Sequence, residues 1–313
     1  MKKIFAIFLT LCLIAGAICI TAFAADNEPD EGTVLRVGAL KRDGSYEFIE
    51  DYDNFEDGWN GAMELADDAD EMKDNHYDRI VVDLYADWTA QYGRFTDDYW
   101  NGPGFDWDTI YFQDDVKFTL NMNGHTIDRA MTTWAYNGEV MTIDEDADVI
   151  INNGTIKGGW SGNGAGGIHI HDGANVTLNN VNVIGNTADD DDGGGIAVYD
   201  SATLTMNGGS LKDNYIDSMA NGYKGVAVYV EDSVAIFNDV EFKNNQASSN
   251  LSMGAAIYSS SSQITLNRCT FDGNGNYDEE KNYSSPESLI EIYGSSTATI
   301  KDCTFIENGA VEG

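Results

Sequence analysis

The sequence has few residues that restrain a chain covalently or rigidly, with four cysteines and three prolines among 313 residues. Cys12 and Cys19 lie in an apolar N-terminal run, which leaves Cys269 and Cys303 for the rest of the chain and excludes a disulfide-rich scaffold. Basic residues are also scarce, 17 against 53 acidic ones, for a formal net charge of −36. Nucleic acid and anionic membranes would repel such a chain, whereas cations, neutral glycans and basic partners would not.

The N-terminus has the pattern of a signal peptide. Lys2-Lys3 precedes an apolar run from Ile4 to Phe23, and Ala22-Phe23-Ala24 supplies small residues for cleavage. We expect cleavage after Ala24, followed by secretion or display at the cell surface without membrane insertion of the mature chain. An uncleaved membrane anchor is the alternative, because the run approaches spanning length. Neither cysteine of this run follows a small residue, so a lipid-modified cysteine is not expected.

From residue 118 onward a single pattern recurs, in which eight residues alternate between apolar and polar and an asparagine often follows three places later. The pattern fits at seven places: 120–127, 149–156, 176–183, 204–211, 235–242, 264–271 and 298–305. Alternation of period two at a spacing near 30 residues predicts a parallel β-solenoid of about seven coils, wound right-handed as parallel crossovers are. A propeller is less consistent, because its blades need about 40 residues or more.

Superposition of these repeats predicts three inward columns. Two are apolar and the third is a ladder of asparagine amides: Leu178, Met206, Phe237, Leu266, Ile300; Val183, Leu211, Phe242, Phe271, Phe305; and Asn186, Asn214, Asn245, Asn274, Asn308. Cys269 and Cys303 also share a column. Their side chains would point the same way from neighbouring parallel strands, which makes a disulfide awkward, so we expect free thiols in the core.

A further short strand is expected before each of these repeats, as in Gly194-Gly195-Ile196 and Gly254-Ala255-Ala256-Ile257. Together with Phe242-Lys243-Asn244-Asn245 and Phe271-Asp272-Gly273-Asn274, these segments resemble the GGAI and FxxN repeats of polymorphic outer-membrane-type β-helix proteins. Residues 119–127, TLNMNGHTI, are similar to a first-coil motif common in exported, pectate-lyase-like right-handed β-helix proteins of bacteria. The resemblance covers roughly residues 118–313 and implies the fold. The families concerned include polysaccharide lyases, hydrolases, adhesins and proteins without known chemistry.

Three regions follow: a signal peptide at 1–24, an N-terminal cap region at 25–117 and the β-helix at 118–313. In the cap, apolar residues on one face predict a helix that begins after the N-cap Asn54 and covers the open end of the solenoid: Phe55, Trp59, Ala62, Met63, Ala66 and Ala69. Residues 79–85 then predict a strand that enters the first coils. The chain stops directly after a regular coil, so we expect either a self-capping last coil or the front part of a longer protein.

Nine aromatic residues lie between Trp88 and Phe112. Their rings, with Trp100 and Trp107 as the candidates for ligand binding, could stack on sugars. The alternative is a satellite core in which the rings bury one another against the cap, and the sequence favours it.

The candidate catalytic residues lie on the strand at 168–170. With Ile168 and Ile170 inward, His169 and His171 point outward, and the register places Asp144 on the preceding coil beside His171. Two histidines with Asp144 and Asp172 nearby could bind a transition metal or supply a general base; the alternative is an ordinary surface pair.

Two further sets are candidates for ligand binding. The outward column beside His171 is expected to run through Tyr199, Tyr229, Ser259 and Tyr293, which could form a sugar-binding strip or simply pack across strands. A turn contains four consecutive carboxylates that could bind calcium or remain solvated: Asp189, Asp190, Asp191 and Asp192.

Three functions remain open from the sequence. Export, an elongated acidic scaffold and the absence of a recognised catalytic signature favour a non-enzymatic module for glycan binding or adhesion, with a polysaccharide or cell-surface glycan as its partner. A polysaccharide lyase or glycoside hydrolase that uses the His169/His171 face is the second. A structural stalk within a longer surface protein is the third.

Overall fold

The computed structural model describes residues 28–90, 105–106, 109–189, 191–217, 224–248, 254–275 and 288–309. The signal-peptide segment, Trp100, Trp107 and Asp190 therefore lie outside the described residues. Among those described, no helix is long and apolar enough to cross a membrane.

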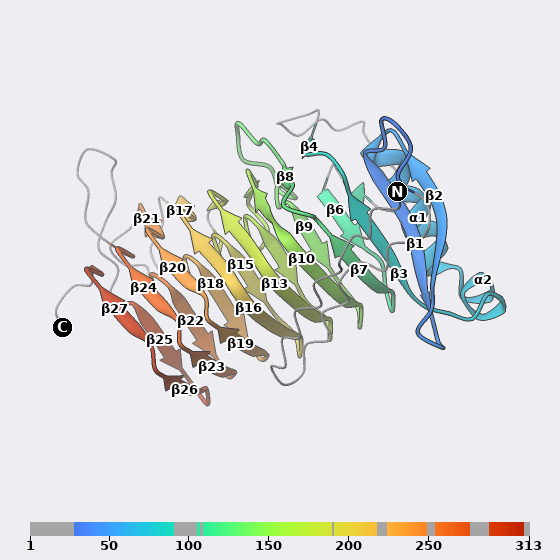
Figure 1. Cartoon of the computed structure of the whole chain (residues 1–313). Coiled ribbons are helices and arrows are strands. Elements are labelled where there is room, and N and C mark those ends of the chain that lie inside the picture. The colour runs from blue at the N-terminus through green and yellow to red at the C-terminus, as the bar shows by residue number, and fades with distance from the viewer. Residues whose placement is uncertain are drawn as a thin grey trace, which may run out of the picture.

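The chain forms a β-solenoid, as the repeat predicted, with about six turns between its first and last stacked strands. Figure 1 shows the strands side by side, from the end that contains α1 and β1–β2 to the end that contains β26 and β27. Each coil contributes to a long sheet, here called sheet A, and to a second sheet, sheet B, and several coils also contribute to a small sheet C.

Sheet A has fifteen strands. In chain order they are β1 (Leu35–Lys41), β2 (Tyr46–Tyr52), β3 (Tyr77–Leu84), β4 (Trp88–Thr89), β7 (Lys117–Asn121), β8 (Thr126–Asp128), β10 (Asp148–Lys157), β13 (Asn175–Ile184), β16 (Thr203–Lys212), β19 (Val234–Asn238), β20 (Glu241–Lys243), β23 (Gln263–Asn267), β24 (Thr270–Asp272), β26 (Thr297–Lys301) and β27 (Thr304–Ile306).

Sheet B contains β5 (Phe105–Asp106), β6 (Thr109–Phe112), β9 (Met141–Ile143), β12 (Ile168–Ile170), β15 (Ile196–Val198), β18 (Val228–Glu231), β22 (Ile257–Ser260) and β25 (Ile290–Tyr293). Sheet C contains β11 (Trp160–Ser161), β14 (Thr187–Asp189), β17 (Tyr215–Asp217) and β21 (Gln246–Ala247). Neighbouring coils pair in parallel throughout.

The predicted inward columns are confirmed. Leu178 pairs with Met206, Met206 with Phe237, and Phe237 with Leu266, all of them fully buried. At the far end the same columns become exposed, since Ile300 and Phe305 retain 49% and 51% of their accessible surface. The solenoid therefore presents apolar side chains at its last described coil.

The buried asparagine ladder is also confirmed. The backbone N–H and side-chain Nδ2 of Asn186 both donate to Oδ1 of Asn214, at 3.1 Å. Nδ2 of Asn214 in turn donates to Oδ1 of Asn245 and to the Val183 carbonyl. Each amide thus bonds to backbone groups of the preceding coil and to the amide of the next coil, which satisfies the buried polar groups of the ladder.

The N-terminal region covers one end of the solenoid. Helix α1 (Phe55–Asp67) begins after Asn54, whose side chain accepts from the N–H groups of Glu56 and Asp57 as an N-cap does. Trp59 packs against Phe112 and Phe118 of the first coil, with ring centroids about 5 Å apart. The expected helix is confirmed, but Ala69 lies outside it, exposed, in the short helix α2 (Ala69–Asp74).

Two strands of the cap were not anticipated. Strand β3 enters the solenoid by pairing in parallel with β7, as predicted, and its other edge pairs with β1, which pairs with β2, both antiparallel. These antiparallel strands extend sheet A beyond the first coil, so the cap protects the edge with a sheet extension as well as a helix.

Candidate functional site

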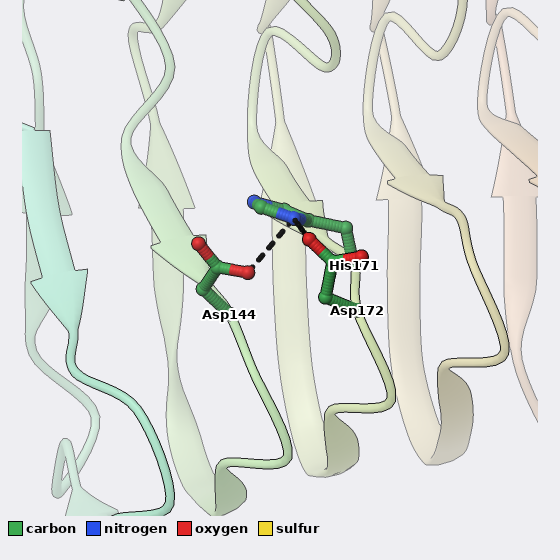
Figure 2. Close-up of side chains that lie close together, drawn as sticks. All are labelled: Asp144, His171 and Asp172. Atoms are coloured by element: carbon green, nitrogen blue, oxygen red, sulfur yellow. Dashed lines mark hydrogen bonds and ion pairs between the residues drawn. The ribbon is translucent and has the colours of Figure 1, made fainter.

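The outer side of sheet B brings together the residues predicted to be catalytic. β12 places His169 and His171 outward, and β9 and β15 lie in register on either side, which puts Asp144 and Tyr199 beside His171. The imidazole Nδ1 of His171 lies 2.8 Å from Oδ1 of Asp144 and 3.0 Å from Oδ2 of Asp172. Figure 2 shows both carboxylates directed at this nitrogen.

The cluster is joined by close contacts at one ring nitrogen. In the tautomer with Nδ1–H, the ring of His171 can donate to either carboxylate, because an ionised carboxylate only accepts hydrogen bonds. The side chains of Asp144 and His171 keep 16% and 20% of their surface exposed, whereas Asp172 keeps 54%. The hydroxyl of Tyr111 donates to the other oxygen of Asp144 at 3.3 Å. The cluster is therefore partly sheltered but open to solvent at Asp172.

His169 has a different environment from His171. Its ring lies 4.6 Å from that of His171, centroid to centroid, and a methyl group at Gly164 would collide with it. Burial lowers the pKa of His169 to about 3, so the ring is neutral at ordinary pH. The structure thus brings the two predicted histidines together. His169 packs against its neighbours and does not carry a charge.

The expected tyrosine column is wrong in its register. Tyr293 pairs with Ser260, so it belongs to the column of His171, whereas Tyr229 and Tyr258 belong to the column of His169. Ser259 is fully buried and pairs with Val230 on the inner side. The expected column aligns Tyr199 with Tyr229, whereas Val228 pairs with Ile196 and Tyr229 with Ala197.

The tyrosine rings nevertheless contact one another, with centroids 5.2 Å apart from Tyr199 to Tyr229 and 5.5 Å from Tyr229 to Tyr258. They form a small second core with Ala165 and Ala197, in which Tyr229 and Tyr258 expose 4% and 2% of their surface. Tyr293 is 59% exposed. Most of this strip therefore packs internally, and its middle rings present little surface to a ligand.

The described members of the acidic turn bind separate donors. Asp189 accepts from the indole N–H of Trp160 at 3.2 Å, Asp191 from the N–H of Gly164 at 2.7 Å, and Asp192 from the N–H of Lys224 at 2.5 Å. Burial raises the pKa of Asp192 to about 7. These three carboxylates connect neighbouring loops, and calcium binding by the turn stays a prediction.

Sequence reasoning missed one neutral part of the outer side of sheet A, which does not include the outward acids Glu241 and Asp272 on β20 and β24. Three outward positions on each of β13, β16, β19, β23 and β26 form three columns, here called the sheet A face: Asn175, Thr203, Val234, Gln263, Thr297; Thr177, Thr205, Ile236, Thr265, Thr299; and Asn179, Asn207, Asn238, Asn267, Lys301. About one residue in six of the chain is acidic, yet this face contains no carboxylate and one charge, Lys301. The outward positions of the repeat would have revealed it.

The third column of the sheet A face is a second asparagine ladder. Nδ2 of Asn207 donates to Oδ1 of Asn179, and Nδ2 of Asn238 and Asn267 continue the chain of bonds, at 2.9–3.0 Å. Each amide keeps a second N–H and a second lone pair that can face outward. Half-buried threonines and asparagines with free bonding capacity thus repeat at the strand spacing of about 4.8 Å.

Comparison with known proteins agrees with this architecture. The family model described as right handed beta helix region matches residues 106–271, more than half of the chain. No curated protein and no solved structure matches. The match supports the fold and leaves the function to be inferred from the surface.

Proposed function

Since the chain belongs to the right-handed β-helix family, we propose that it is an exported, non-enzymatic module that binds a neutral polysaccharide on the sheet A face. The observation that carries the proposal is the exclusion of carboxylates from this face in a chain with a net charge of −36. On β10, which precedes β13, the first column of the face continues with Asp148. This carboxylate forms an ion pair with Arg79 at 2.5 Å, so the neutral character extends to that strand.

The chemistry of the sheet A face suits a neutral glycan. Repeated amides and hydroxyls can exchange hydrogen bonds with sugar hydroxyls, and the methyl groups of Thr177 and Ile236 can contact the apolar faces of the rings. An acidic polymer would meet the negative potential of the rest of the molecule. The stacked coils repeat the same groups along the solenoid axis, as an extended polymer repeats its sugars.

The test is depletion of the purified chain from solution by insoluble cellulose, chitin and β-1,3-glucan, with alginate and polygalacturonate as acidic comparisons. We expect binding to at least one neutral polymer and none to the acidic ones. The double variant Thr177→Glu/Thr265→Glu adds two charges to the face and should lower the bound fraction severalfold. The matched control is Thr155→Glu/Thr270→Glu, which alters half-buried threonines of sheet A outside the face and should bind normally.

Equal binding by both double variants, or no binding to any neutral polymer, would refute the proposal. Sedimentation at increasing concentration tests the other occupant of such a face, a second copy of the chain. A dimer that the face variant abolishes and the control variant retains would replace glycan binding with self-association. Export is tested separately, by expressing the chain with its native N-terminus and asking whether the released protein begins at Ala25.

One contact favours a second candidate, a lyase or hydrolase. The pair formed by Asp144 and His171 could transfer protons on an exposed face, as a general acid or base requires. Incubation with neutral and acidic polysaccharides, with and without calcium, should then yield new reducing ends or unsaturated products. Activity that is unchanged in His171→Ala would exclude this site.

A further inference from the structure

We propose that Asp144, His171 and Asp172 bind one divalent transition-metal ion, for which zinc is the probe. Among the residues that the structure describes, one group of three potential ligands of this kind is found, and its ligand atoms all lie within 4.8 Å of one another. The ligands come from two successive coils, because Asp144 follows β9 and His171-Asp172 follows β12. The proposal does not depend on glycan binding, which uses another sheet.

The distances suit a metal ion. Bonds of about 2.0–2.2 Å at tetrahedral or octahedral angles place neighbouring ligand atoms about 3.0–3.5 Å apart. Nδ1 of His171 already lies 2.8 Å from an oxygen of Asp144 and 3.0 Å from an oxygen of Asp172, so small rotations of these two carboxylates would open the required space. In Figure 2 the three groups converge on one point between the two coils. The metal would replace the proton that Nδ1 now shares with them.

The surrounding charges also favour a cation. The ion pairs of Asp144 and Asp172 within the described residues are with His171, and neither has a lysine or arginine partner. Glu145 and Asp146, both exposed, follow Asp144 directly in the chain, so this corner of the surface holds several carboxylates close together.

The set of ligands indicates the class of ion. Imidazole is a ligand of zinc and other first-row transition ions, whereas calcium and magnesium prefer all-oxygen sites with six or more ligands. Tyr111 donates to the Asp144 oxygen that faces away from His171, which is the arrangement of an outer-shell group that orients a ligand. Three protein ligands leave a position for water on the exposed side at Asp172.

The experiment is isothermal titration of the untagged chain with zinc chloride, with calcium chloride as the comparison. We expect one zinc per chain, binding weakened at least tenfold in His171→Ala and in Asp144→Asn/Asp172→Asn, and about tenfold in the positioning variant Tyr111→Phe. His125→Ala is the matched control, because Nδ1 of His125 contacts a single carboxylate, Asp87, at 3.1 Å. This variant should bind zinc as the parent chain does.

Circular dichroism of each variant shows whether the solenoid is intact, so that loss of folding is not read as loss of metal. No zinc binding by the parent chain, zinc binding unchanged in His171→Ala, or equal loss in His125→Ala would each overturn the proposal. Anomalous scattering from a zinc-soaked crystal gives an independent readout of the ion's position. Polysaccharide depletion by His171→Ala should equal that of the parent chain, which separates the two proposals.

Discussion

The carboxylate Oε2 of Glu139 accepts a hydrogen bond from the hydroxyl of Ser161 at 2.7 Å, in a part of the solenoid where both residues are buried. Its other oxygen accepts from the hydroxyl of Thr142 at 3.1 Å. Burial of this acid outweighs those hydrogen bonds and raises its pKa to about 7. Glu139 therefore holds a proton in the folded chain at pH values where the unfolded chain has released it.

The first prediction concerns the pH dependence of stability. Between pH 4.5 and 7 the folded state binds more protons at Glu139 than the unfolded state, so this residue lowers stability progressively as pH rises. Glu139→Gln keeps the shape without the titrating group, so its stability should fall less than that of the parent chain between pH 4.5 and 7. Urea unfolding across this range measures the difference. Glu241→Gln, which removes one carboxylate at a half-buried outward site, is the matched control.

A second prediction concerns the buried asparagine ladder. Asn214→Ala removes the acceptor of two N–H groups of Asn186 and the side-chain donor to the Val183 carbonyl, while Asn245 keeps only the backbone N–H of residue 214 as its donor from that coil. Unsatisfied buried groups cost about 1–3 kcal/mol each, so we expect a loss of about 3 kcal/mol or more in unfolding free energy. Asn207→Ala, in the outer ladder, should cost about 1 kcal/mol because water can replace its bonds. Equal losses would contradict this account.

The third prediction concerns a glycine at the entry to sheet B. Gly225 has φ +66°, and a methyl group there would meet the Val228 carbonyl oxygen and lie 2.7 Å from Cα of Tyr229. Gly225→Ala should therefore lower the thermal midpoint markedly. Gly124→Ala is the comparison, since φ is +89° but no atom lies within 4 Å of the added methyl, and it should cost about 1–2 kcal/mol for the backbone alone.

A fourth prediction distinguishes the two free thiols. Cys269 is 1% exposed, and burial raises its pKa to about 11, whereas Cys303 is half-buried. In native Cys303→Ser protein that begins at Ala25 and so lacks Cys12 and Cys19, the remaining thiol should react with iodoacetamide roughly a hundredfold more slowly than an ordinary cysteine. In native Cys269→Ser, the thiol of Cys303 should react readily. In denaturant, the two variants should react at the same rate. A parent chain without reactive thiols even in denaturant would instead indicate a disulfide.

The sequence by itself determined the fold, because alternation of period two repeated along the chain leaves stacked coils as the arrangement that buries every apolar column. The pairs of Leu178 with Met206 and of Asn186 with Asn214 follow from superimposing the repeats. The helix after Asn54 follows in the same way from local spacing and capping. These features depend on short-range pattern, which is visible in one chain.

Tertiary structure alone decided how the turns and side chains are arranged around this frame. Turn length shifts the register of the short sheet B strands, which placed Tyr229 beside Tyr258 in a small core and not in line with Tyr293. The contact of Asp144 with His171, and the burial of Glu139 beside Ser161, involve residues of neighbouring coils. A repeat specifies which way a side chain points from its strand, but packing between coils determines what it touches and how much water reaches it.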